Sequence, residues 1–323
     1  MVVKFTLRQL EYFVAVGECG SIAAAGEKLN VSSPAISASI LQLEAVLGIS
    51  LFTRKHAQGL MLTRAGEEIL SKSKGLLQCA DDLNAHVNEI SDSIKGQLKI
   101  AALVTFAAIL VPRLRSSFEK LYTEVKITHT EMDQAAIYKA LHKAEIDLAL
   151  TYDLNIPPDF QFFPFLELPP FVLMSVEHPL ANMDQVSPAD IVAHPLVLLD
   201  LPYSSKYFLS FFNDLEEKPN IAERTKDIAV MRSLVANGFG YSIANVLPQN
   251  CQSPDGQPLK CVPLKSNKNP VKLGALTTQG TRNSRTVRKF IEHCSEFISQ
   301  SADFNFGISN TNPQISTGAK NLS

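Results

Sequence analysis

Apolar residues recur at helical spacing in the N-terminal part of the chain, and breaks in the pattern divide it into three segments. The first segment begins at Leu7 and ends at Gly20, which interrupts the helix. The second is short and alanine-rich, from Ile22 to Leu29, and Ser21 before it is a favourable N-cap. These segments are predicted to form short amphipathic helices.

The third segment begins with Ser33 at the cap and Pro34 at the first helical position, the residues that a helix start prefers. It continues to about Leu47. A tight turn and several small residues let the second and third helices cross closely, so we expect a helix-turn-helix from Ile22 to Leu41, whose second helix enters the DNA major groove. Helical periodicity alone also permits an ordinary three-helix bundle.

Two short apolar runs, Ile49–Phe52 and Leu60–Leu62, flank a polar tip that contains glycine, and they predict a hairpin, the wing. Thr63 is expected to cap a long helix that continues to Ile94. That helix has a mostly apolar seam with spacings of four and three, which is typical of pairing with a second copy. The seam residues are Ile69, Ser73, Leu76, Ala80, Leu83, Val87, Ile90 and Ile94.

The order of these elements resembles the LysR-type transcriptional regulators. The family's signature is matched by Leu7-Arg8-Gln9-Leu10 with Tyr12-Phe13, by Ala24 to Leu29, by Ser32 to Ser37, by Leu43-Glu44 with Leu47-Gly48, by Leu51-Phe52 with Arg54, and by Leu62-Thr63 with Ala65-Gly66. The chain departs from the family inside the recognition helix: it has Ser33, Ala38 and Ser39 where the family often has Gln, then polar or basic residues. The resemblance implies a DNA-binding regulator with a dimerising linker helix.

The remainder alternates strands and helices. Leu98–Leu103, Val125–Thr130 and Ile146–Thr151 are predicted strands of a parallel sheet, separated by helices Ile109–Tyr122 and Gln134–Lys143. Near Phe160–Leu168 the chain is expected to cross into a second lobe. The strands predicted there are Phe171–Val176, Leu196–Leu199, Ile221–Thr225 and Tyr241–Ala244, and the helices are Ser204–Leu215 and Ile228–Asn237. We expect Leu259–Leu264 and Val271–Thr277 to lead back to the first lobe, with Arg285–Ser299 as a closing helix.

The predicted fold is therefore an N-terminal all-α winged helix-turn-helix with a long linker helix, followed by a two-lobed α/β effector domain. By the resemblance, that effector domain is periplasmic-binding-protein-like. The expected domains are residues 5–62 for DNA binding, 63–94 for the linker, 95–300 for the effector domain, and 301–323 for a disordered tail rich in Ser, Asn and Gly.

Composition excludes some classes of protein but does not by itself indicate a function. The net charge of -2 and the six Lys/Arg against four Glu in the first 66 residues would not by themselves indicate DNA binding. No signal peptide opens the chain, and its longest uncharged apolar run, Ile100–Pro112, is shorter than the roughly 20 residues that a membrane helix needs. We therefore expect a cytoplasmic protein without a membrane partner. The five scattered cysteines show no metal-ligand spacing, so neither a metal nor a cofactor is expected.

The candidate DNA contacts come from the recognition helix, the wing and the start of the linker. Ser33, Pro34 and Ser37 are expected at the groove-facing end of the helix, and Arg54 is placed to reach a phosphate. The full candidate set is Ser32, Ser33, Pro34, Ser37, Arg54, Thr63 and Arg64. Promoter DNA would be bound by a dimer or a dimer of dimers.

A small effector is expected at the carboxyl ends of the strands. Thr105 is the one hydroxyl in an apolar stretch there, and with free helix N–H groups it would suit a carboxylate, so a small organic acid is the favoured ligand. Thr105 could equally be a simple helix cap. The candidate set is Thr105, Phe106, Gln134, Tyr203, Ser204 and Ser205.

Other classes of protein have weaker support. The sequence has no Gly-rich phosphate loop, no GxSxG and no paired His/Asp constellation, so we do not expect an enzyme. A solute-binding protein would share the two lobes but would need an export signal. A redox-sensing regulator would use Cys251 and Cys261, which lie ten positions apart.

Overall fold

The structure is a computed structural model that describes residues 4–55, 59–89, 94–246, 250–278, 281 and 284–300. Of residues 54, 55, 59, 78, 81, 82 and 84–89 it describes the backbone alone. The predicted tail, 301–323, lies outside the described residues. The chain divides into two compact units, each considered by itself. Unit 1 comprises Met1–Phe163 with Gly274–Ser295, and unit 2 comprises Pro164–Leu273 and the chain from Glu296.

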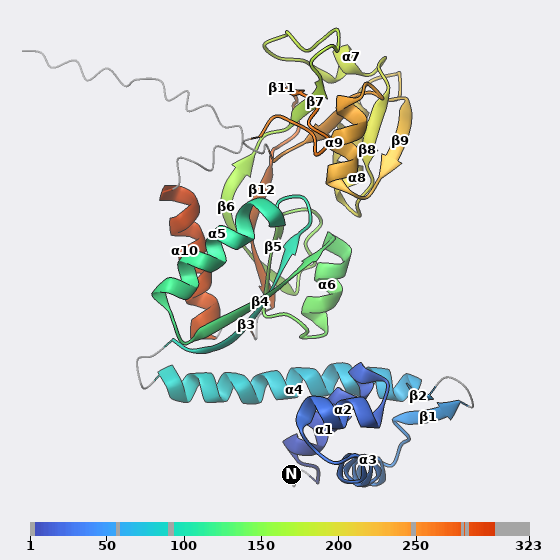
Figure 1. The fold of residues 1–323 in the computed structure, drawn as a ribbon, viewed down its shortest axis with the longest axis vertical. Coiled ribbons are helices and arrows are strands. Elements are labelled where there is room, and N and C mark those ends of the chain that lie inside the picture. Colours follow the sequence, from blue (N-terminus) through green and yellow to red (C-terminus); the bar gives the residue numbers. More distant parts are fainter. Residues whose placement is uncertain are drawn as a thin grey trace, which may run out of the picture. The chain divides into compact units, whose positions relative to one another are not determined.

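The N-terminal helices are α1 (Leu7–Cys19), α2 (Ile22–Leu29) and α3 (Ser33–Leu47), close to their predicted bounds (Figure 1). The predicted cap of α2 is confirmed, because the Ser21 hydroxyl accepts from the Ala24 N–H. The predicted cap of α3 was wrong by one residue. The N-cap is Ser32, whose carbonyl accepts the first helical bonds, and Ser33 is already helical.

Close approach within the helix-turn-helix depends on Gly26. A Cβ atom at this position would lie 2.7 Å from the carbonyl oxygen of Val31, at the turn between α2 and α3. The Val31 N–H donates to the Gly26 carbonyl over 3.0 Å, which closes the turn. The core beneath these helices is formed by Tyr12, Ala15, Val16, Ala25, Ile36 and Ile40.

The wing is the hairpin of β1 (Phe52–Lys55) and β2 (Gly59–Leu62), whose strands pair antiparallel. The predicted hairpin is confirmed, but its first strand begins at Phe52 and not at Ile49. Leu51 is fully buried in the domain core, and its carbonyl accepts from the Thr63 N–H just before the strand begins.

The linker helix is α4 (Arg64–Glu89), and the predicted cap is confirmed by the bond from the Gly66 N–H to the Thr63 hydroxyl, 2.9 Å. The predicted end at Ile94 was wrong, because Ile94 is not helical and the chain soon enters β3 with Gly96 at φ 108°. Of the predicted seam, Ile69 packs into the DNA-binding core, Ile90 lies outside the described residues, and of Val87 only the backbone is described.

A five-stranded sheet has the order β4-β3-β5-β12-β6; β3, β4 and β5 belong to unit 1, and the chain passes from one unit to the other within β6 and β12. The predicted parallel pairing is confirmed, because β3 pairs parallel with both β4 and β5. Helices α5 and α10 lie together, with Phe118 and Phe290 in edge contact at 5.1 Å between ring centroids (Figure 1). The bounds are β3 (Gly96–Leu103), α5 (Ala107–Leu121), β4 (Val125–Met132), α6 (Gln134–His142), β5 (Leu148–Tyr152), β6 (Phe160–Leu168), β12 (Val271–Thr278) and α10 (Arg285–Gln300).

Unit 2 has a three-stranded sheet, β10-β7-β11, and a parallel pair, β8-β9. The prediction that Leu259–Leu264 leads back to the first lobe was wrong, because β11 pairs antiparallel with β7 over its whole length. The bounds are β7 (Phe171–Ser175), α7 (Pro188–Ile191), β8 (Leu196–Leu199), α8 (Ser204–Leu209) with the 3-10 turn η1 (Ser210–Phe212), β9 (Ile221–Thr225), α9 (Ile228–Ala236), β10 (Ser242–Ala244) and β11 (Leu259–Pro263). None of the helices in the described ranges has the length and apolar character that spanning a membrane requires.

Candidate functional site

The outward face of α3 carries a stripe of apolar residues, with the exposed Gln42 at its edge. Three residues, Ile36, Ile40 and Leu43, point into the core. At 3.6 residues per turn, the face opposite them carries residues spaced four, three and four apart, and all are exposed. Those residues are Pro34, Ala38, Leu41 and Ala45, and we call them the outward stripe. Leu41 is 64% exposed, which is high for a leucine.

The serines of α3 lie beside this stripe rather than on it. Ser33 and Ser37 are half-buried, and Ser32 is exposed at the N-cap without a side-chain capping bond. Pro34 is exposed at the start of the helix, where it was expected. The contacts of these residues with DNA remain predictions.

The end of α3 is joined to the wing by Glu44. Its carboxylate accepts the backbone N–H groups of Leu51 at 2.6 Å and Phe52 at 3.2 Å. Leu51 directly precedes β1, and Phe52 is its first residue. A single side chain of the recognition helix therefore positions the first strand of the wing.

The basic residues of the DNA-binding domain differ in the exposure and ion pairing of their side chains. Arg64 is exposed at the start of α4, with one long ion pair of 3.6 Å to Glu68. Lys28 is paired with Glu18 at 2.9 Å. Of Arg54 only the backbone is described, in β1 opposite Leu60. Of the two candidate arginines, Arg64 is the one whose side chain is described, and it is exposed, while Thr63 serves as a cap.

Thr105 lies in the turn between β3 and α5, at the carboxyl end of β3. Its hydroxyl lies 3.2 Å from the Tyr152 hydroxyl at the end of the neighbouring strand β5. The N-cap of α5 is Phe106, and no side chain bonds the first-turn N–H groups. The alternative interpretation of Thr105 as a helix cap was therefore wrong.

Sequence reasoning missed Tyr152. It follows the predicted strand Ile146–Thr151 directly, and the carboxyl ends of neighbouring parallel strands meet at one edge of a sheet, so its position could have been anticipated. Phe106 is fully buried with its ring 5.4 Å from that of Tyr152. Two hydroxyls and an uncapped helix start thus lie together beside two aromatic rings, an arrangement that suits a carboxylate with a small apolar body.

Gln134 is fully buried at the start of α6. Its amide nitrogen donates to the Tyr138 hydroxyl at 2.6 Å and to the carbonyls of Tyr152 and Leu154 at 3.0 and 2.9 Å. Backbone carbonyls only accept, so these partners fix the orientation of the amide. Gln134 therefore holds the segment after β5 in place, while its own carbonyl oxygen has no partner.

In unit 2 the candidates Tyr203, Ser204 and Ser205 begin α8. Tyr203 has φ 65°, a left-handed conformation that is costly for a side chain of this size. Ser204 is buried, and its hydroxyl has no hydrogen-bond partner among the residues that the structure describes. Strain together with an unpaired buried hydroxyl marks this turn as a candidate ligand contact within unit 2.

The glycines after α9 have separate roles. Gly238, at φ 84°, follows the C-cap, and its N–H donates to the Val235 carbonyl, as the predicted helix end requires. The close approach occurs at Gly240, where a Cβ atom would lie 2.1 Å from the carbonyl oxygen of Pro195. This contact fixes the turn that leads to the fully buried Tyr241.

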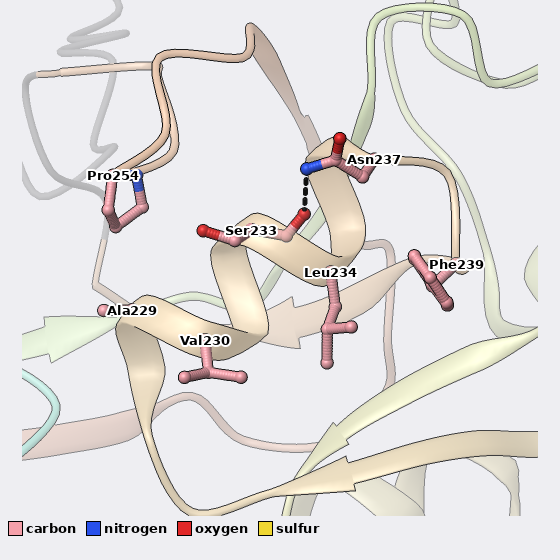
Figure 2. A pocket seen from close by; sticks show the side chains of 7 residues that line it. All are labelled: Ala229, Val230, Ser233, Leu234, Asn237, Phe239 and Pro254. Carbon is pink, nitrogen blue, oxygen red and sulfur yellow. Dashed lines mark hydrogen bonds between the residues drawn. The ribbon is translucent and has the colours of Figure 1, made fainter.

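A cavity of about 440 Å³ lies on the outer side of α9 (Figure 2). In Figure 2, Val230 and Leu234 project from α9, and the side-chain amide of Asn237 donates to the Ser233 carbonyl at 2.9 Å. None of the candidate effector residues lines it. Its lining residues are Ala229, Val230, Ser233, Leu234, Asn237, Phe239 and Pro254. Because carbon dominates this lining, the cavity suits an apolar group and not a carboxylate.

The two cysteines of the redox alternative lie on one hairpin. Gln252 bridges to Pro258, and the Leu259 N–H donates to the Cys251 carbonyl, which places Cys261 diagonally across from Cys251. Burial, with a smaller contribution from Cys251, raises the pKa of the Cys261 thiol to about 12. A reactive thiol needs a lowered pKa, so this environment does not favour redox sensing. Within the described ranges, no cluster of three or more His, Cys, Asp or Glu side chains could hold a metal ion.

Comparisons with known proteins agree with this geometry. Residues 7–67 match the family model "Bacterial regulatory helix-turn-helix protein, lysR family", and residues 91–299 match the "LysR substrate binding domain". The chain is 29% identical to the HTH-type transcriptional regulator BsdA of Bacillus subtilis over 244 residues, which are 74% of this chain and 83% of BsdA.

Solved structures give the same result for the fold. HinK, a LysR family transcriptional regulator from Pseudomonas aeruginosa, is 31% identical with a TM-score of 0.61, covering 91% of this chain and 99% of HinK. A full-length OxyR variant from the same organism has a TM-score of 0.69, covering 90% of this chain and 98% of that protein. At 20% identity, the OxyR likeness concerns the fold alone.

Proposed function

The chain belongs to the LysR family of bacterial DNA-binding transcriptional regulators, and on that premise we propose that it is a dimeric regulator whose response to a small carboxylate begins at Thr105. The observation that carries the proposal is the pair of hydroxyls of Thr105 and Tyr152 beside the uncapped N-terminus of α5. First-turn N–H groups and the positive end of the helix dipole both favour an anion.

The aromatic rings of Phe106 and Tyr152 support a ligand that has an apolar body as well as a carboxylate. In unit 2, the unpaired hydroxyl of Ser204 offers a further polar contact within that unit. A small organic acid meets these requirements better than a sugar or a nucleotide, because the chain has no Gly-rich phosphate loop.

Self-association is proposed to use α4. Leu76 and Leu83 lie one heptad apart on this helix, and they are 45% and 67% exposed in the single chain. Leucines at this spacing favour pairing with a second helix. A pair of linker helices would hold two recognition helices at a fixed separation, so each dimer would read two half-sites about 10 base pairs apart.

The test combines a thermal-shift screen of small organic acids with paired substitutions at one position. A ligand that raises the melting temperature of the native chain should raise it less for Thr105→Val at the same ligand concentration, because this variant keeps the shape and removes the hydroxyl. Thr105→Ser, which keeps the hydroxyl, is the matched control and should retain most of the response. A lost hydrogen bond of this kind costs on the order of 1 kcal/mol, about a fivefold loss of affinity.

DNA binding is measured on the same variants by gel shift. We expect Thr105→Val to bind DNA like the native chain in the absence of ligand. An undiminished ligand response of Thr105→Val would refute the proposed site. The redox alternative is tested by non-reducing mass spectrometry after mild peroxide: a disulfide between Cys251 and Cys261 would support it.

A further inference from the structure

The outward stripe of α3 presents carbon alone at its side-chain ends. Pro34, Ala38 and Leu41 face away from the core, and every one of them is exposed. Along the helix axis these residues span about 10 Å, at about 1.5 Å per residue. That length corresponds to about three base-pair steps of roughly 3.4 Å each. The stripe therefore covers about four consecutive base pairs.

The polar side chains of the helix lie beside this stripe. Ser33, Ser37 and Ser39 are half-buried, and the carboxylate of Glu44 accepts the backbone N–H groups of Leu51 and Phe52. Gln42 is exposed at the edge of the stripe, and its amide oxygen accepts from the Gln9 side chain at 3.4 Å. The stripe has no donor or acceptor for the polar edges of a base. In the major groove the apolar group available to it is the C5-methyl of thymine. Guanine O6 and N7 would lose water against such a surface and gain no hydrogen bond in return.

The size of the side chains favours DNA over a protein partner. Ala38 and Ala45 are small, so the helix backbone can approach the floor of a groove closely. Protein interfaces usually concentrate their binding energy in aromatic or Arg anchors, and the stripe has neither. Its one large residue is Leu41, at 64% exposure.

We propose that the outward stripe recognises thymine methyl groups, so that each half-site contains a thymine-rich core of about four base pairs. Pro34, Ala38 and Leu41 supply the contacts, while Ser32 and Ser33 approach the phosphates at the start of the helix. This inference rests on the proposed function and specifies how the DNA sequence is read.

The test begins with selection of DNA from a random double-stranded library by the full chain. In the selected sequence, each half-site thymine is then replaced by deoxyuridine, which removes the methyl and keeps the base pairing. Each methyl in contact should weaken binding about fourfold, the factor that corresponds to about 0.8 kcal/mol per buried carbon. Deoxyuridine placed between the half-sites is the control and should have no effect.

Variants connect the effect to the stripe. Leu41→Ala should bind the thymine site less tightly and lose most of the penalty for deoxyuridine at the base that Leu41 contacts. Val46→Ala is the matched control, because Val46 is exposed on the same helix but outside the stripe. Both substitutions are exposed, so the helix is retained.

The outcomes separate the two levels of the proposal. If the selected DNA binds tightly and its binding is insensitive to deoxyuridine, the methyl contacts are overturned and the proposed function as a DNA-binding regulator still holds. If no sequence is enriched from the library, both the methyl contacts and the proposed function as a DNA-binding regulator are overturned. A change of oligomeric state in Leu41→Ala, with the deoxyuridine penalty unchanged, would assign the stripe to a protein partner and overturn the inference.

Discussion

Glu44 is predicted to determine the local stability of the junction between α3 and the wing. Its carboxylate accepts two N–H groups, one of them from the fully buried Leu51. Glu44→Ala leaves both donors without this partner. An unsatisfied buried donor costs about 1–3 kcal/mol. Phe52 is only half-buried, so water can compensate part of its loss. We therefore expect Glu44→Ala to destabilise the junction by about 2–3 kcal/mol.

Glu44→Gln is the matched control. The amide oxygen can accept the same two N–H groups, but hydrogen bonds to a neutral group contribute less than those to a charged one. The expected loss for Glu44→Gln is about 1 kcal/mol. The difference between the two variants therefore measures the acceptor itself, separately from its charge.

Hydrogen exchange followed by mass spectrometry on the full chain measures this local stability, because the amides of Leu51 and Phe52 exchange through local opening. Peptides that begin near Gly48 and end before residue 56 should exchange about 30- to 150-fold faster in Glu44→Ala, at about 1.4 kcal/mol per factor of ten. Peptides from α9 serve as the internal reference. Exchange in Glu44→Ala within about twofold of the native rate would show that water replaces the carboxylate, and the reasoning would be refuted.

Three further predictions concern self-association, pH and DNA contact. Leu83→Glu should raise the dimer dissociation constant, measured by sedimentation, at least about a hundredfold, because each helix of the pair loses a buried leucine worth about 1.5–3 kcal/mol. Met183→Glu, also at an exposed apolar site, is the control. An unchanged molecular mass for Leu83→Glu would exclude pairing through α4. Burial, aided by the neighbouring His194, lowers the pKa of His178, whose Nδ1 accepts the Leu180 N–H. The folded state therefore binds fewer protons at His178 than the unfolded state does. Hydrogen exchange should show that unit 2 loses stability as the pH falls below about 6.5. His178→Asn keeps an acceptor that does not titrate and should flatten that dependence, so an equally steep loss in this variant would exclude His178 as its cause. Arg54→Ala should weaken binding to all DNA sequences alike and reduce the salt dependence by about one unit, whereas a loss confined to the selected site would assign Arg54 to base contacts.

The sequence by itself determined the order and type of the elements. Periodicity and caps gave α1, α2 and the start of α4 because helices and their ends depend on local spacing and local hydrogen bonds. Alternating apolar strands and helices likewise gave the parallel part of the unit 1 sheet. The errors occurred where distant residues decide the use of an apolar run: β1 begins at Phe52 because Leu51 is buried in the core before it, and Leu259–Pro263 pairs within unit 2.

The tertiary structure alone decided how the candidate residues are used. Thr105 was identified from its position in the sequence, but its partner Tyr152 comes from a strand 47 positions later. The Ser204 hydroxyl, unpaired among the described residues, and the three acceptors around the Gln134 amide nitrogen depend on which chain segments surround them. The apolar character of the outward stripe also required the structure, because exposure depends on which side of α3 packs against α1 and the wing. Local pattern fixes where a helix begins and ends, whereas contacts between distant segments decide which of its side chains remain available to bind.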